Sequence, residues 1–219
     1  MKTGILLTVA GLLAWSSIAA WAAPPDAAGI ASQGNGHGAP PCASCHAADG
    51  AGQPAAGFPR LAGLNEAYLA RQLDDFASGS RANPVMAPIA KALSEDERRA
   101  LAAYYSGMPI PAAAAKGTTP PTDALGEQLA LHGRWNKQVP ACVACHGPHG
   151  VGVGEHFPPL AGQSTTYIAN QLREWQQGKR KNDPLGLMQH VASALDDNDV
   201  DAVAAWFAAQ PAAVPGGKP

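Results

Sequence analysis

The pentapeptide C-x-x-C-H occurs twice in this chain of 219 residues, at 42–46 and at 142–146. The residues that follow also repeat. FPRLAGLNEAYLARQLDDFASGSRAN from Phe58 aligns without a gap with FPPLAGQSTTYIANQLREWQQGKRKN from Phe157. A third segment near the end of each copy matches with only small insertions. The chain is therefore a tandem duplication of one domain, and its fold must be built twice around the same motif.

The stretch between the two copies, 107–123, contains four prolines and no apolar periodicity, which predicts an extended linker. We expect one domain at 24–112, a connector at 113–119 and a second domain at 120–215. Each domain then has about 90 residues, which is enough for a small core.

The first 22 residues have the layout of a secretory signal peptide, with a basic Lys2, an apolar stretch and the small-x-small site Ala20-Trp21-Ala22. The alternative is a retained membrane anchor, but the apolar stretch is shorter than the roughly 20 residues that span a bilayer. We therefore expect export to the periplasm with the signal peptide removed.

Charge excludes one class of partner. The chain has 15 Lys and Arg against 17 Asp and Glu, a net charge of −2, whereas a nucleic-acid-binding protein needs a basic face. We therefore expect no nucleic-acid partner.

Helical signals dominate both copies, and no alternating strand pattern is visible, so the predicted class is all-α. One helix in each copy should begin after a capping residue and stop near a glycine, and a last helix should begin with acidic residues in its first turn. The capping residues are Asn65, Ser164, Ser94 and Asp196, and the two glycines are Gly79 and Gly178.

Two glutamines, Gln72 and Gln171, fall on the otherwise apolar faces of these helices. A buried amide needs hydrogen-bond partners. We therefore expect the two glutamines to be hydrogen-bonded near a cofactor or the domain junction. The alternative is a position at the edge of the solvent-exposed surface. The first copy also has a glycine-rich stretch, 29–41, before its motif, which predicts a poor helix there.

A C-x-x-C-H run in an exported chain is a signature of covalent c-type haem attachment. The two thiols form thioethers with one haem, and the adjoining imidazole binds its iron. A thioredoxin-like dithiol is the competing interpretation, but it requires a βαβ context that this chain lacks. The predicted cofactors are two haem c groups, the first on Cys42, Cys45 and His46 and the second on Cys142, Cys145 and His146.

Alignment of the two copies selects the sixth iron ligand. Met188 aligns with Met86, whereas Met108 has no counterpart and reads as a linker residue. Met86 and Met188 are therefore the predicted axial ligands, and a thioether in that position favours reduced iron. Histidine is the rival ligand, but the remaining histidines do not match between the copies. Iron with both positions filled by protein leaves no site for a substrate, so we expect an electron carrier and not an enzyme.

At this point the chain resembles the dihaem class I cytochromes c of the cytochrome c4 type. The resemblance covers nearly the whole mature chain and rests on CASCH and CVACH, FPRLAG and FPPLAG, YLARQL and YIANQL, GSRAN and GKRKN, and the late methionines. It implies two small helical domains, each wrapping one haem, with haem propionates near the junction. It also implies that the carbonyls of Pro59 and Pro158 accept a hydrogen bond from the haem-ligating histidines.

The resemblance further implies a periplasmic carrier, soluble or loosely membrane-associated. The leading functional hypothesis is a shuttle of single electrons from a donor such as the bc1 complex to a terminal oxidase, for example of the cbb3 type. The alternative is a cytochrome subunit or electron acceptor of a specific periplasmic dehydrogenase. A dihaem peroxidase would need an open iron position, which paired methionine ligands would close.

Overall fold

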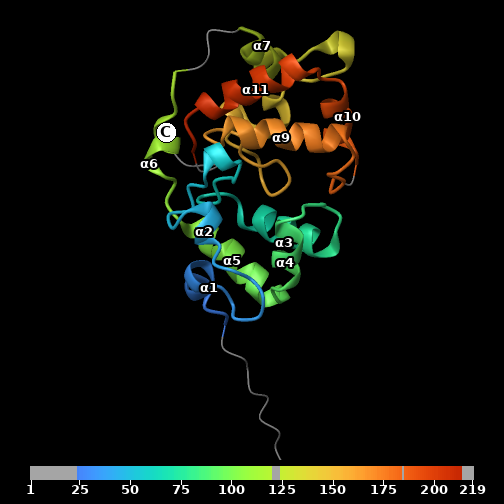
Figure 1. Cartoon of the computed structure of the whole chain (residues 1–219). Helices are drawn as coiled ribbons and strands as arrows, with labels where there is room; N and C mark the ends of the chain where they lie inside the picture. The colour runs from blue at the N-terminus through green and yellow to red at the C-terminus, as the bar shows by residue number, and fades with distance from the viewer. Residues whose placement is uncertain (1–23, 120–123, 184, 214–219) are drawn as a thin grey trace, which may run out of the picture.

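The computed structural model describes residues 24–119, 124–183 and 185–213, so the predicted signal peptide lies outside the described residues. The two copies form two helical units stacked end to end, the first blue to green and the second yellow to red (Figure 1). The described residues contain helices, turns and four isolated β-bridges, and no named strand among them. The all-α prediction is confirmed. None of the described helices is long and apolar enough to cross a membrane.

The two units share the order of their α-helices, and the second has an additional 3-10 turn, η2, before its motif. The first consists of α1 (Ala27–Gln33), α2 (Ala43–His46), η1 (Pro54–Ala56), α3 (Glu66–Ser78), α4 (Met86–Lys91) and α5 (Glu95–Gly107). The second consists of α7 (Ala124–His132), η2 (Trp135–Lys137), α8 (Val143–His146), η3 (Pro148–Gly150), α9 (Thr165–Gln176), α10 (Leu187–Ser193) and α11 (Asp197–Ala209). The long helices α3 and α5 pack together in the first unit, as α9 and α11 do in the second.

The predicted helix starts are confirmed. The side chains of Asn65 and Ser164 accept hydrogen bonds from the backbone N–H three residues on, at 3.0 and 3.1 Å. Ser94 and Asp196 each form a capping box at the start of the last helix. Gly79 closes α3 in a left-handed conformation, as predicted, whereas α9 is capped by Gln177, one residue before the predicted glycine.

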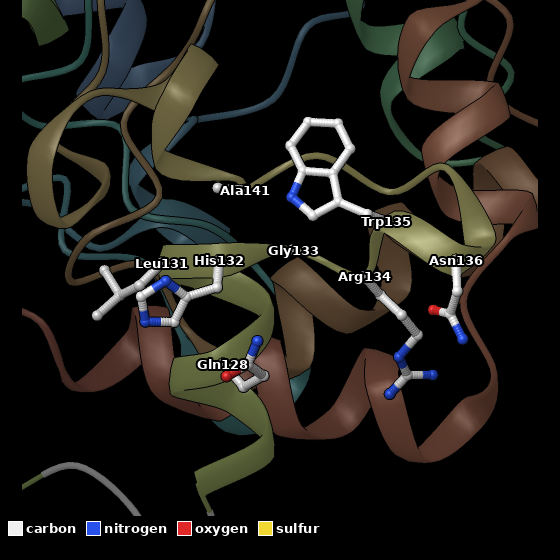
Figure 2. A pocket seen from close by; sticks show the side chains of 8 residues that line it. All are labelled: Gln128, Leu131, His132, Gly133, Arg134, Trp135, Asn136 and Ala141. Atoms are coloured by element: carbon white, nitrogen blue, oxygen red, sulfur yellow. The ribbon is translucent and has the colours of Figure 1, made fainter.

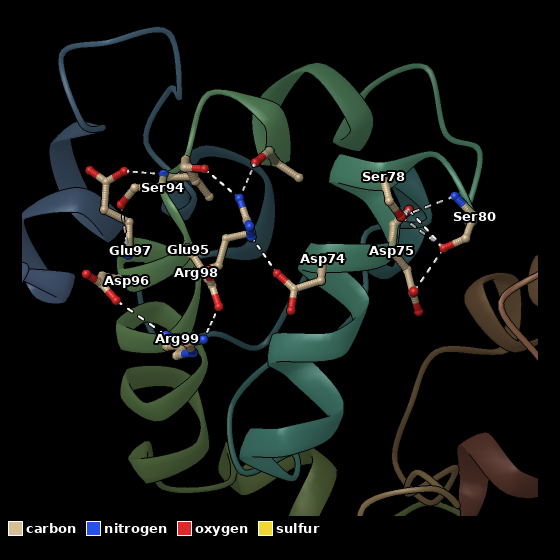
Figure 3. Close-up of polar contacts among 12 residues, drawn as sticks. Asp74, Asp75, Ser78, Ser80, Ser94, Glu95, Asp96, Glu97, Arg98 and Arg99 are labelled. Carbon is tan, nitrogen blue, oxygen red and sulfur yellow. Dashed lines mark hydrogen bonds and ion pairs between the residues drawn. The ribbon is translucent and has the colours of Figure 1, made fainter.

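Each unit has its own core. The first includes Leu69, Leu101 and Tyr105, and the second is larger and includes Trp206 and Phe207. In the first unit Arg98 fixes the turn between α4 and α5. It donates to the Asp74 carboxylate on α3 at 2.6 Å and to the Leu93 carbonyl at 2.6 Å (Figure 3). The helix that starts at Met86 is thereby held against α3.

Three local expectations differ from the structure. The segment predicted as an extended linker contains a helix, α6 (Ala112–Lys116), whose Ala114 carbonyl accepts a hydrogen bond from Ala212 N–H at 2.8 Å. Met108 is a partly buried residue packed on the first core, not a linker residue. The glycine-rich stretch before the first motif begins inside α1, because burial of Ile30 and Ala31 outweighs the low helix propensity.

The two units are joined by direct contacts between residues about 100 positions apart. The Gln163 side chain accepts from Arg60 N–H and donates to the Arg60 carbonyl, both at 3.0 Å. An antiparallel bridge pairs Arg81 with Arg180. Arg71 on α3 donates to the Glu155 carbonyl at 2.6 Å. The junction is therefore polar and specifically paired.

Candidate cofactor sites

The two C-x-x-C-H motifs form matching single turns of helix, α2 and α8. In each turn the histidine N–H donates to the carbonyl of the first cysteine, at 2.9 Å in both copies. None of the four motif cysteines is paired in a disulfide; Cys42, Cys45 and Cys142 are half-buried, and Cys145 is exposed. One turn of helix places both thiols of a motif on the same short segment as its imidazole, as attachment to one haem requires.

The two motif histidines are buried and held in one orientation. His46 Nδ1 lies 3.0 Å from the Pro59 carbonyl oxygen, and His146 Nδ1 lies 2.8 Å from the Pro158 carbonyl oxygen. Since a carbonyl can only accept, Nδ1 carries the hydrogen and Nε2 keeps a free lone pair. Burial lowers the pKa of both histidines, which favours the neutral imidazole that binds iron. The donor chemistry fits a haem ligand in each copy.

The two predicted methionine ligands lie in the first turn of equivalent helices. Met86 is the first residue of α4, and Met188 is the second residue of α10. The N–H of Met86 donates to Asn83 Oδ1 at 2.9 Å, and the N–H of Met188 donates to Asp183 Oδ2 at 2.5 Å. The two extra residues of the second loop therefore fall between the side chain that accepts this hydrogen bond and its methionine.

In the second copy, the predicted methionine ligand and the first motif cysteine border the same core cluster. Met188 and Cys142 both pack against the second core cluster, as does Trp175. In the first copy Cys42 and Ile89, which follows Met86 on α4, border the first core cluster. The ligation roles of both methionines remain predictions.

Two arginines at the junction were not assigned a role from the sequence. Arg81 and Arg180 are 4% and 5% exposed. Arg81 donates to Gln72 Oε1 at 2.9 Å and to Gln171 Oε1, and Arg180 donates to the same two oxygens at 3.2 and 2.9 Å. The two glutamines therefore lie at the domain junction, one of the two places that the sequence predicted.

Among the described residues, no carboxylate lies within 4.0 Å of either guanidinium. Arg81 also has a buried Nε without a hydrogen-bond partner. Two adjacent cations buried in this way are costly unless an anion completes the site. Haem carries two carboxylates, so the charge of this cluster fits the cofactor that the motifs indicate. The sequence signal for it is the arginine repeated in GSRAN and GKRKN.

Tyrosines extend the cluster across the junction. Arg81 Nη2 donates to the hydroxyl of Tyr167, which belongs to the other unit, at 3.0 Å. Arg180 likewise interacts with Tyr68, and the two nearby cations lower the pKa of that phenol even though burial alone would raise it. Each unit thus contributes a tyrosine to the arginine of its neighbour.

Comparisons with known proteins agree with this geometry. Residues 31–108 match the family model described as cytochrome c, and residues 128–207 match the model described as cytochrome C oxidase, cbb3-type, subunit III. The solved structure of reduced recombinant cytochrome c4 from Pseudomonas stutzeri aligns with a TM-score of 0.71 and 34% identity, covering 77% of this chain and 93% of that one. The chain belongs to the dihaem cytochrome c4 family.

Two other relatives of this cytochrome carry a different description. The thiosulfate dehydrogenase electron acceptor of Stutzerimonas stutzeri (strain A1501) is 56% identical over 76% of this chain and 77% of its own length. A thiosulfate dehydrogenase (TsdBA) structure from Marichromatium purpuratum aligns with a TM-score of 0.77 and 44% identity over 84% of this chain. The cytochrome spans only 40% of the length of that chain.

The cytochrome is a dihaem electron carrier with one covalently bound haem c on each motif. The haem irons supply reversible one-electron chemistry. The residues of the chain hold each haem by two thioethers, orient a neutral imidazole through a proline carbonyl and place buried positive charge at the junction.

Proposed function

We propose that this cytochrome is the electron acceptor of a periplasmic thiosulfate dehydrogenase. The observation that carries the proposal is the 56% identity to a protein described as such an acceptor, compared with 34% to a solved cytochrome c4. The match to a chain described as a thiosulfate dehydrogenase supports the same partner. These relatives favour a dedicated dehydrogenase partner over a general shuttle between the bc1 complex and an oxidase.

The fold suits an acceptor of single electrons. Two cofactor-binding units in one chain can store two electrons, and the paired polar junction fixes the units relative to each other. With the units fixed in this way, an electron can pass from one cofactor to the other without a motion of the domains. The signal-like segment 1–22 supports a periplasmic location for the reaction.

The test is direct reduction of the oxidised holoprotein. Purified thiosulfate dehydrogenase from Stutzerimonas stutzeri and thiosulfate are mixed with the cytochrome, and haem reduction is followed by absorbance. We expect saturable reduction of both haems that depends on enzyme and on thiosulfate. A single-haem cytochrome c of similar potential serves as control. Equal rates for the control and this cytochrome, or no reduction, would contradict the proposal. Cell fractionation tests the periplasmic location.

A further inference from the structure

Exposed apolar side chains are unevenly distributed between the two units. Five large hydrophobic residues of the described chain are exposed, and four of them belong to the second unit. They are Trp135, Val153, Leu185 and Leu187, whereas the first unit contributes Val85. Exposed apolar side chains often lie at the centre of the surface that a partner protein covers. Tryptophan is enriched among the residues that contribute most to binding at such surfaces.

Trp135 is the most informative of the four because it borders a cavity. The indole is 71% exposed and lies beside an open pocket of about 590 Å³. Gln128 and His132 from α7 and Trp135 from η2 are among the residues that line it (Figure 2). Ala141, which also lines the pocket, directly precedes Cys142. The pocket thus adjoins the segment that carries the second haem.

The first unit has no tryptophan at the matching position. Asn35 N–H donates to the Ala39 carbonyl, as Arg134 N–H donates to the Val139 carbonyl, so the two loops occupy matching positions. The residue after Asn35 is Gly36, where the second unit has Trp135. The duplicated fold therefore does not require an indole at this place.

The loop that carries the indole is held in place by ion pairs, and its charges cancel. Arg134 donates two hydrogen bonds to the Asp199 carboxylate at 2.6 and 2.5 Å, and Asp199 is 1% exposed. Lys137 lies 3.4 Å from Asp196. The two cations of the loop are therefore compensated by two carboxylates, one on α11 and one on the residue that caps it. Charge complementarity would therefore add little to binding here, and we expect the partner's surface to be uncharged with apolar residues at its centre.

We propose that the pocket beside Trp135 is the docking site for the redox partner, and that it receives an apolar side chain from an uncharged patch of the dehydrogenase. The inference rests on the proposed function and specifies which unit meets the partner. We assign docking to the second unit because it has the exposed indole and the pocket, and because the charges of the surrounding loop are paired. These features adjoin the motif that binds the second haem.

The experiment compares holoprotein variants in the dehydrogenase assay. Trp135→Ala should lower the kcat/KM for reduction by the dehydrogenase about tenfold or more, the usual loss when a central indole is truncated. Trp135→Phe should restore most of it. Reduction by ascorbate and the haem absorbance should not change, because the side chain is exposed. Leu185→Ala is the matched control, since Leu185 is 81% exposed in the same unit but outside the pocket.

The outcomes separate this inference from the proposed function. If the wild type is not reduced by the dehydrogenase, the proposed function fails and the docking assignment fails with it. If the wild type is reduced but Trp135→Ala is reduced equally fast, only the docking assignment fails. Equal losses for Trp135→Ala and Leu185→Ala would overturn it as well, as would a steep dependence of the rate on salt. Gel filtration that shows a dimer of wild type and a monomer of Trp135→Ala would assign the surface to self-association instead.

Discussion

Arg81 of the first unit and Arg180 of the second form an antiparallel bridge at the junction, and their buried guanidinium groups share the amide oxygens of Gln72 and Gln171. The arrangement is nearly symmetric, because each glutamine accepts from both arginines. Two positive charges are thus concentrated where the two cofactor-binding units meet.

Removing one of these charges should lower the haem potentials. Arg81→Gln removes a buried cation that stabilises reduced over oxidised haem near the junction, and we expect a negative shift on the order of tens of millivolts. An optical redox titration of wild type and variant measures it. Arg180→Gln should act in the same direction, and Arg99→Gln, on the exposed face of α5, is the control. Unchanged potentials in both junction variants would refute the electrostatic role.

The axial methionines can be tested by ligand binding. Met86→Ala or Met188→Ala should open one iron to carbon monoxide and halve the weak far-red absorption of methionine-ligated ferric haem. Met108→Ala is the control, because Met108 packs on the first core cluster. That control should lose about 2 kcal/mol of stability without binding carbon monoxide. Carbon monoxide binding in the Met108 variant alone would reassign the ligand.

We expect the two domains to unfold together in one cooperative transition, because the contacts at their junction couple them. Gln163→Ala removes two hydrogen bonds to the Arg60 backbone and leaves a buried donor and acceptor unpaired, at a cost of about 2 to 4 kcal/mol. Calorimetry should then resolve two transitions where the wild type shows one. Gln177→Ala, at an exposed position, is the matched control. A single unshifted transition in Gln163→Ala would show that the contact contributes nothing.

Acid should lower the stability that Glu97 contributes through its hydrogen bonds to Ser94 and to Asn35, in the loop before the first motif. Partial burial raises the pKa of Glu97, but hydrogen bonds from the Ser94 backbone and from Asn35 outweigh it, so the folded pKa is lowered. A lowered carboxyl pKa contributes stability above the unfolded value, which is lost as pH falls through the folded value. Melting temperatures between pH 3 and 6 should therefore fall more steeply in wild type than in Glu97→Gln. Parallel curves would exclude this linkage.

The helix starts were predictable because capping is local. Asn65, Ser164, Ser94 and Asp196 each bond a backbone N–H three residues away, so the signal and the structure lie within one turn. The same holds for the motif histidines, which sit one turn after the first cysteine of the same helix. The differences at α6 and Met108 have the opposite cause, since both depend on packing against residues distant in the chain.

The sequence by itself determined the duplicated all-α domain, the two haem c attachment sites and the histidines that serve them, because each is encoded in a short contiguous pattern repeated once. Only the tertiary structure decided that Arg81 and Arg180 are buried together, that Gln163 clamps Arg60, and that the exposed indole of Trp135 lies beside a pocket next to the second motif. The physical reason is that burial and pairing depend on which surfaces meet. The surfaces that meet at the junction belong to residues about 100 positions apart in the sequence.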